Sequence, residues 1–380
     1  MSKVAVIRCD SYDPDAVGAA VRRGVDLLGG MDSFVSRDEK ILLKPNLLAA
    51  DPPDKCTTTH PAVFTAVAGL VLETGARVSF GDSPAVGSTA GAARKSGLLE
   101  AARELDIPMA DFKEGVEADY PEGRQNKRFV IARAVMESDG LVSLPKLKTH
   151  GFEKYTGAVK NQFGCIPGVL KGEFHVKLPD AGDFARMLLD LNAFVKPRLY
   201  IMDGIMAMEG NGPRGGKVKP MHVLLFSVDA VALDATACRI IGVNPRYVPT
   251  VQIGHDLGYG TAGEDAVEIL GDDITSFVDN TFDIDRDPLK PFRAAGIMKF
   301  FRNRIVPKPV IDESRCVRCG ICIDMCPAQP KAVNWDRGDK SCAPVYSYAS
   351  CIRCYCCQEL CPESAITLKK PMVRKLFSRS

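Results

Sequence analysis

Residues 140–150 read Gly-Leu-Val-Ser-Leu-Pro-Lys-Leu-Lys-Thr-His, a short apolar run that stops at a proline and continues in lysines and a histidine. A short apolar run bounded by such a break is typical of a buried strand. The same pattern occurs at residues 40–46, 77–82 and 198–203. Helical patterns lie between these runs. The first 285 residues therefore predict an α/β domain with a mostly parallel sheet and flanking helices.

The remaining predicted elements complete this alternation. Two more apolar runs predict strands, at Val4–Arg8 and Met221–Ser227. Capping and proline signals predict helices over residues 14–28, 60–73, 88–105 and 229–241.

Polar side chains follow the predicted strands, and we expect them to line one pocket. In open α/β sheets, ligands bind beyond the carboxyl ends of the strands. Lysines bind carboxylate or phosphate as point charges, and asparagine amides donate hydrogen bonds. The predicted substrate-binding residues are Lys44, Asn46, Asp82, Lys148, Lys160 and Asn161. The alternative is that these are ordinary polar loops and solvated surface charges.

Three residues of this group are predicted to be catalytic, namely Lys146, His150 and Asp203. His150 is the predicted proton donor, because the ordinary pKa of histidine lies near neutrality. A glycine-rich stretch at residues 210–216 is either an anion-binding loop or a surface loop, and it lacks the Gly-Lys-Ser/Thr ending of a Walker loop.

Cysteines are concentrated near the C-terminal end of the chain. Of the 14 cysteines, all but Cys9, Cys56, Cys165 and Cys238 lie between Cys316 and Cys361. The spacing C-x2-C-x2-C-x3-C-P occurs twice, at residues 316–327 and 351–362. This is the bacterial ferredoxin spacing for [4Fe–4S] clusters, and zinc sites use pairs of cysteines instead. The region resembles a two-cluster ferredoxin domain, which implies a small α+β fold.

In two-cluster ferredoxins the fourth cysteine of each run binds the other cluster. One predicted ligand set is therefore Cys316, Cys319, Cys322 and Cys361. The second predicted set is Cys351, Cys354, Cys357 and Cys326. Cys342 and Cys356 are left over, and Cys356 either competes for iron or is a spare thiol.

Several motifs of the body occur together in a known family. They are Lys44-Pro45-Asn46, residues 144–150, Gly157–Gly164, Asp203-Gly204-Ile205, residues 209–213, and Asp229 with Asp234. With these motifs and the C-terminal cysteines, the chain resembles the bacterial and archaeal family known as domain of unknown function 362. The resemblance covers residues 1–285 and implies an architecture rather than a reaction, because that family has no assigned activity.

Charge is unevenly distributed and suggests where the parts divide. Residues 1–285 are acidic overall and the rest is basic, although the whole chain has a net charge of only +2. We predict a body at 1–285, a basic linker at 286–310, a ferredoxin domain at 311–370 and a basic tail at 371–380. Residues 290–306 and the tail could contact an anionic membrane or an acidic electron donor. The alternative is a helix packed on the acidic body.

The composition also narrows the partners and the location. The small net charge gives no case for nucleic-acid binding. No apolar run is long enough to span a membrane, and the N-terminal apolar run is too short for a signal peptide, so we predict a cytoplasmic protein.

These features together predict an iron–sulfur oxidoreductase. It would pass electrons from two [4Fe–4S] clusters to a small anionic substrate in the body, and a redox partner protein would exchange electrons with it. Two alternatives remain open: an electron carrier or docking module, and a ligase or isomerase with redox-sensing clusters.

Overall fold

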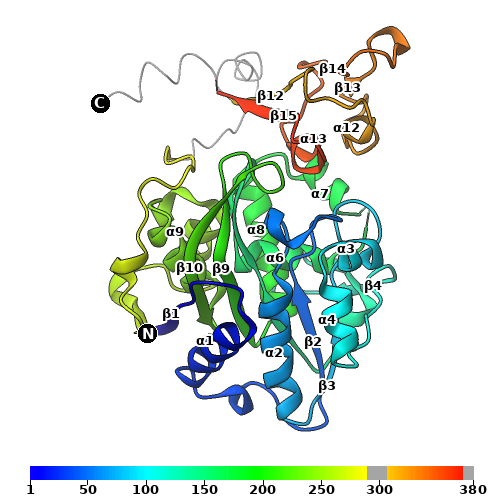
Figure 1. The fold of residues 1–380 in the computed structure, drawn as a ribbon. Helices are drawn as coiled ribbons and strands as arrows, with labels where there is room; N and C mark the ends of the chain where they lie inside the picture. The colour runs from blue at the N-terminus through cyan, green and yellow to red at the C-terminus, as the bar shows by residue number, and fades with distance from the viewer. Residues whose placement is uncertain (169, 289–305, 371–380) are drawn as a thin grey trace.

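The computed structural model describes residues 1–168, 170–288 and 306–370. A large α/β body carries a small C-terminal unit at one end (Figure 1). The proposed membrane-contacting stretch and the basic tail lie almost entirely outside the described residues. Across the described ranges, every helix is too short or too polar to cross a bilayer.

The body is built on a mixed sheet in which most strand pairs are parallel. The strand order is β11-β1-β10-β9-β6-β2-β3, with β7 beside β9 and β8 beside β7. Only the pairs β1/β10, β9/β10 and β7/β8 are antiparallel. The strands are β1 Ser2–Arg8, β2 Lys40–Pro45, β3 Arg77–Phe80, β6 Gly140–Leu144, β7 Lys146–His150, β8 Lys154–Thr156, β9 Leu199–Glu209, β10 Lys217–Ser227 and β11 Val267–Gly271.

Helices cover both faces of the sheet, so the body has two hydrophobic cores. Successive residues of a strand point to opposite faces. Val4 and Val6 of β1 therefore enter one core, whereas Ala5 and Ile7 enter the other. The second core is covered by α1 Pro14–Asp26, α2 Pro61–Glu73, α3 Thr89–Lys95 and α4 Leu98–Glu104. The first is covered by α6 Ala158–Asn161, α7 Leu170–Lys177, α8 Ala181–Val195, α9 Ala230–Ile240 and α10 Pro249–Asp256.

The predicted fold class is confirmed, and three local expectations need correction. The predicted helix over residues 88–105 is two helices, because Gly97 has a φ of +79° that ends the first. Residues 146–150 form a further strand, β7, rather than a loop. The apolar runs near 200 and 224 extend into a long β9–β10 hairpin, whose turn is the glycine-rich stretch 210–216. A separate hairpin of β4 Gly115–Asp119 and β5 Arg128–Ala132 leads into α5 Arg133–Met136.

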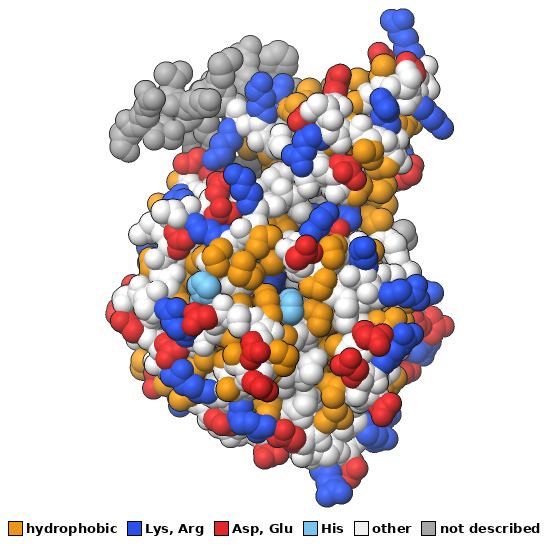
Figure 2. All heavy atoms as spheres, viewed as in Figure 1, with side chains coloured by type: hydrophobic (Ala, Val, Ile, Leu, Met, Phe, Trp, Pro, Cys, Tyr) orange, Lys and Arg blue, Asp and Glu red, His pale blue; other side chains and the backbone are white. Residues whose placement is uncertain are grey.

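The C-terminal unit is small and held by short elements. Strand β12 Lys308–Ile311 pairs with β15 Ile366–Lys369, and β13 Val333–Asn334 pairs with β14 Val345–Tyr346. Two short helices, α12 Ile321–Asp324 and α13 Cys356–Leu360, contain or follow cysteines of the two runs. Figure 2 shows this unit seated on the body, with acidic and basic side chains interspersed over the visible face.

A buried carboxylate joins two helices of the body. Asp234 of α9 is 1% exposed and accepts hydrogen bonds from the backbone N–H groups of Ala158 (2.7 Å) and Val159 (3.1 Å) in α6. The Tyr155 hydroxyl donates a third, at 3.3 Å. Because α6 carries Lys160 and Asn161, Asp234 fixes two of the predicted binding residues.

We predict that Asp234→Ala destabilises the body by about 2–4 kcal/mol, because it leaves buried donors without an acceptor. The midpoint of thermal unfolding, followed by circular dichroism, should fall by several degrees. Asp256→Ala, at an exposed position of α10, is the control. An unchanged midpoint in Asp234→Ala would contradict this role.

Candidate functional site

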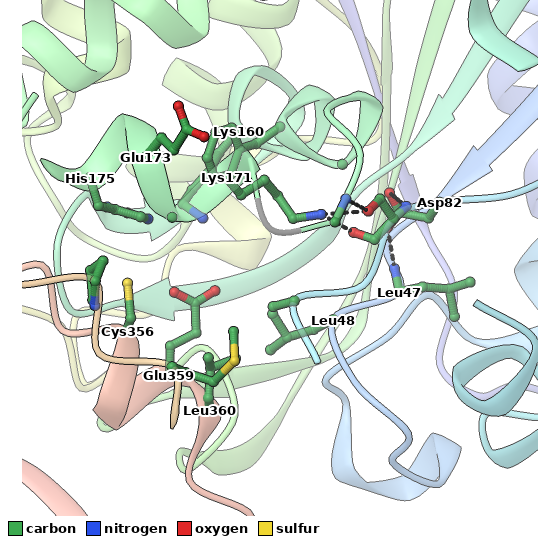
Figure 3. Close-up of a pocket in the computed structure, with 18 of the residues that line it drawn as sticks. Leu47, Leu48, Asp82, Lys160, Lys171, Glu173, His175, Cys356, Glu359 and Leu360 are labelled. Carbon is green, nitrogen blue, oxygen red and sulfur yellow. Dashed lines mark hydrogen bonds between the residues drawn. The ribbon is translucent and has the colours of Figure 1, made fainter. Parts of the chain in front are cut away.

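The largest cavity near the predicted residues lies between the body and the C-terminal unit. Its volume is about 450 Å³. One wall comes from the loops after β2 and β3 and from α6 and α7, and the other from residues 324–327 and α13 (Figure 3). A much smaller cavity of about 30 Å³ shares Asn46, Leu48, Lys160, Asn161 and Glu359 with it. The two form one site at the carboxyl ends of the parallel strands.

The structure brings most of the predicted binding residues to this site. Asn46, Asp82, Lys160 and Asn161 line the larger cavity. Lys146 and Lys148 line the smaller one. Lys44, His150 and Asp203 line neither, but each contacts a residue that does.

Lys44 and Asp82 form a buried ion pair beneath the cavity. Their Nζ and Oδ1 atoms are 2.8 Å apart, and both side chains are almost fully buried. Asp82 also accepts hydrogen bonds from the backbone N–H groups of Leu47 (2.7 Å) and Ser83 (2.9 Å). A Cβ atom at Gly164 would lie 1.8 Å from Asp82 Oδ1, so this close approach requires glycine.

A second buried network surrounds Lys146. Its ammonium donates to Asp203 Oδ2 and to the Tyr12 hydroxyl, both at 2.7 Å. The Tyr12 hydroxyl donates to Asp203 Oδ1 at 2.8 Å, and the His60 backbone N–H donates to Oδ2 at 3.0 Å. The Tyr12 ring stacks on His60 with centroids 3.5 Å apart. Asp203 is therefore saturated by this chain's own donors.

Lys148 is buried, and within the described ranges its ammonium forms no ion pair with a carboxylate. The ammonium donates to the Thr57 carbonyl at 2.5 Å. Burial, together with the charge of Lys160, lowers the pKa of Lys148 to about 7. At neutral pH this amine can both hold and release a proton at the smaller cavity.

His150 does not keep the near-neutral pKa on which its predicted role as a proton donor was based. Its Nδ1 accepts hydrogen bonds from the backbone N–H groups of Phe152 (3.0 Å) and Glu153 (3.1 Å). This leaves the proton on Nε2, which lies 3.4 Å from Glu359 Oε2. Burial lowers the pKa of His150 to about 4. His150 is therefore neutral near pH 7 and holds Glu359 in place.

Several residues of the site had no sequence signal. Lys171 lines the cavity from α7, which follows no strand, and its ammonium donates to Ser83 Oγ at 2.6 Å. Burial lowers the pKa of Lys171 to about 8. His175, from the same helix, and Glu359, from the C-terminal unit, also line the cavity. Burial alone would raise the pKa of Glu359, but the charge of Lys160 holds that pKa well below its usual range.

The glycine-rich stretch docks the C-terminal unit onto the body. Gln358 donates to the carbonyls of Asn211 and Gly212, both at 3.0 Å, and Asn211 donates to the Ile366 carbonyl at 3.0 Å. Arg214 donates to the Leu360 carbonyl at 3.0 Å and pairs with the buried Asp51. These contacts make residues 210–216 a docking loop, a use that differs from both of the predicted ones.

The cysteines gather in two sets that fit the predicted ligation. A small cavity is lined by Cys316, Cys319, Cys322 and Cys361, so the fourth thiol comes from the other run. The Cys357 thiol lies near Cys351 and Cys354, and Cys351 packs in one cluster with Cys326. The backbone N–H groups of Ala332 and Ala365 donate to the sulfurs of Cys326 and Cys361, each at 3.3 Å. The fourth cysteine of each run thus accepts a hydrogen bond from a backbone N–H group a few residues further along the chain.

The donor set itself bears on the metal. Each set consists of four cysteines, three from one run and the fourth from the other run. Such a set suits a [4Fe–4S] cluster, in which each thiolate binds a different iron.

Fold and cysteine sets together define an α/β protein joined to a ferredoxin-type unit. A family model described as a 4Fe-4S binding domain matches residues 309–330, so this unit binds an iron–sulfur cluster. A second model, described as domain of unknown function (DUF362), matches residues 41–239. The chain belongs to the DUF362 family, which confirms the resemblance inferred from its motifs.

Similar proteins include one from Synechocystis sp. named a thylakoid-associated protein. It is 38% identical over 266 residues, which is 70% of this chain and 82% of that protein. Among solved structures, the lactate racemase apoprotein from Thermoanaerobacterium thermosaccharolyticum is 15% identical with a TM-score of 0.39, covering 63% of this chain and 56% of that one. A protein from Thermotoga maritima is 12% identical with a TM-score of 0.37, covering 61% of this chain and 59% of that one.

We predict that the half-buried His60 and the buried His150 and His175 stay neutral well below pH 6.5. Burial lowers the pKa values of His60 and His150 to about 4 and that of His175 to about 3. The unfolded chain binds more protons than the folded one between about pH 6.5 and pH 4. The free energy of unfolding therefore decreases as the pH is lowered through that window. The decrease is up to about 1.4 kcal/mol per pH unit for each histidine.

An NMR titration of the imidazole protons checks this. The three signals, assigned with His→Gln variants, should not shift between about pH 8 and pH 5.5. His175→Phe should also reduce the pH dependence of stability, since the ring stacks on Phe184 and a phenyl group fits there. Titration of any of the three near pH 6.5 would contradict the burial argument.

Proposed function

We propose that this protein is an iron–sulfur oxidoreductase that acts on a small anionic molecule in the cavity between its two parts. The observation that carries the proposal is the composition of the cavity wall. Lys160 and Asn161 of the body face the same space as Cys326, a proposed cluster ligand, and Cys356. A molecule bound by the body would thus lie against the protein shell of a cluster.

Two [4Fe–4S] clusters are part of this proposal. One would be held by Cys316, Cys319, Cys322 and Cys361, and the other by Cys351, Cys354, Cys357 and Cys326. Such clusters supply electrons one at a time. Cys319 is exposed, whereas the cysteines at residues 351–357 are buried. We therefore propose that a redox partner protein docks on the exposed side near Cys319, away from the cavity.

The residues of the body would bind the substrate and supply protons. Lys160 would hold the anionic group, and Asn46 and Asn161 would orient it. Lys148 replaces His150 as the proposed proton donor, because its pKa of about 7 lets it give up a proton at neutral pH. Lys146 and Asp203 would act as positioning residues, because their polar atoms are occupied by each other and by Tyr12. A cytoplasmic location is also part of this proposal.

Metal analysis tests the cluster content. Anaerobically purified protein should contain about eight irons and eight sulfides per chain. Cys326→Ala should remove the iron of the cluster bound by residues 351–357 and leave the other cluster, as seen by electron paramagnetic resonance of the reduced protein. Cys342→Ala, at an exposed cysteine outside both sets, is the control. Zinc, or loss of the cluster bound by Cys316, Cys319 and Cys322 instead, would refute the assignment.

Reoxidation of the reduced protein tests the enzymatic role. Anaerobic mixing of the reduced protein with a panel of small carboxylic acids and phosphates should restore cluster absorbance, as electrons pass to the compound, with a rate that saturates for at least one compound. Lys148→Met should slow that rate about 100-fold or more, in the range of a lost proton donor, with both clusters retained. Lys95→Met, on the exposed surface of α3, should react at the wild-type rate.

Two outcomes would favour the other functions. If no compound accelerates reoxidation and only protein acceptors do, the chain is an electron carrier. If a compound is transformed without any change in cluster oxidation state, a ligase or isomerase activity takes precedence.

A further inference from the structure

We propose that the cavity takes a monocarboxylate with a mainly apolar body, and not a phosphate ester. This deepens the proposed function, because it names the substrate class of the same cavity. It depends on how many cations near the cavity are free to bind a ligand, on the acid that shares the space, and on the nature of the remaining wall.

Five lysines surround the cavity, and three of them already have a buried partner or have used all their donors. Lys44 pairs with Asp82 and Lys146 pairs with Asp203, whereas Lys148, the proposed proton donor, makes one hydrogen bond, to the Thr57 carbonyl. Lys171 uses all three of its N–H donors, on Ser83 Oγ (2.6 Å), the Ser83 carbonyl (2.8 Å) and the Ile166 carbonyl (3.2 Å).

Lys160 differs from the other four lysines. In the part of the chain that the structure describes, its ammonium has no hydrogen bond or ion pair. Its nitrogen lies 5.9 Å from the centroid of the Phe163 ring, near the limit for a cation–π contact. Lys160 lines both cavities, so a ligand in either can reach it.

An acidic side chain in the same cavity limits the charge of the ligand. The Glu359 carboxylate lines both cavities and is held by His150 Nε2 at 3.4 Å. A phosphate ester carries about −1.5 to −2 at neutral pH, so it would face Glu359 with one free ammonium to balance it. A carboxylate carries a single negative charge, so beside Lys160 it meets less repulsion from Glu359 than a phosphate ester does.

The rest of the wall is suited to an apolar body. Side chains of Leu48, Phe163, Val176, Met325 and Leu360 line it. The volume of about 450 Å³ lies within the usual range of sites for small organic molecules. An inorganic anion would leave most of this wall without contact.

Two polar atoms at the wall await a partner. Asn46 Oδ1 and His175 Nδ1 are buried and find no hydrogen-bond partner among residues 1–168, 170–288 and 306–370, and both residues line the cavity. His175 as a whole is only 5% exposed. Figure 3 shows Lys160 and His175 in the upper part of the view and Glu359 with Cys356 in the lower part. Buried polar atoms left unpaired are costly, so these two atoms indicate a cavity built to hold a ligand.

Calorimetric titration of the full-length, oxidised, cluster-loaded protein tests the proposal without any electron donor. The probes are hexanoate, hexanamide and hexyl phosphate, which share one apolar chain and differ in head-group charge. Hexanoate should bind at least about tenfold more tightly than either of the others. Lys160→Met should weaken hexanoate binding about tenfold and leave hexanamide binding unchanged, whereas Lys160→Arg should restore it.

The control is Lys177→Met on α7, whose side chain is 69% exposed and pairs with Glu173. It should bind all three probes as the wild type does. Tighter binding of hexyl phosphate, equal binding of all three probes, or no binding would each overturn the proposal. Because no electron is transferred here, hexanoate binding in a protein that reduces nothing would refute the oxidoreductase and leave the ligand class standing.

Discussion

Positive charge buried at the carboxyl ends of the strands is the constraint on which the site depends. Lys44 and Lys146 are at most 2% exposed, and an unpaired ammonium at such a depth would cost several kcal/mol. Asp82 and Asp203 neutralise these two lysines from within the body. Lys148 and Lys160 have a carboxylate near them that comes from the C-terminal unit, namely Glu359. Its negative charge raises the pKa of Lys148. Docking of the C-terminal unit therefore brings a negative charge to the buried lysines, and the same unit forms one wall of the cavity.

Strand pairing explains why these charges meet. Strands β2 and β3 are parallel neighbours, and Leu43 lies opposite Phe80. Lys44 is one residue beyond Leu43 and Asp82 is two residues beyond Phe80, so both lie at the same edge of the sheet. Lys146 of β7 is the direct partner of Asp203 in β9. The buried pairs thus follow from the register of the sheet. The same edge leaves a space that the ferredoxin-type unit covers, held there by the β9–β10 turn.

Local pattern identified the lysines after the strands, but not what each of them does. Lys44 and Lys146 look alike in the sequence, since each comes just after an apolar run, and Lys160 differs from them only by standing in a glycine-punctuated stretch. Only the fold shows that two are paired with buried aspartates and that Lys160 is not. His150 looked like a proton donor because of its ordinary pKa, which burial and two backbone donors change. Tyr12, Lys171, His175 and Glu359 carried no signal, because they come from segments that only tertiary contacts bring to the cavity.

The sequence by itself determined the α/β architecture, the cysteine spacing and the residues that follow the strands, because these depend on periodicity and on distances of a few residues along the chain. The tertiary structure decided which cations are free, which carboxylates are buried and where the two parts meet. Those properties depend on strand register and on the docking of α13 against the strand ends, which join residues more than 100 positions apart, such as Lys44 with Asn161 and His150 with Glu359. No local pattern encodes a contact across such a separation.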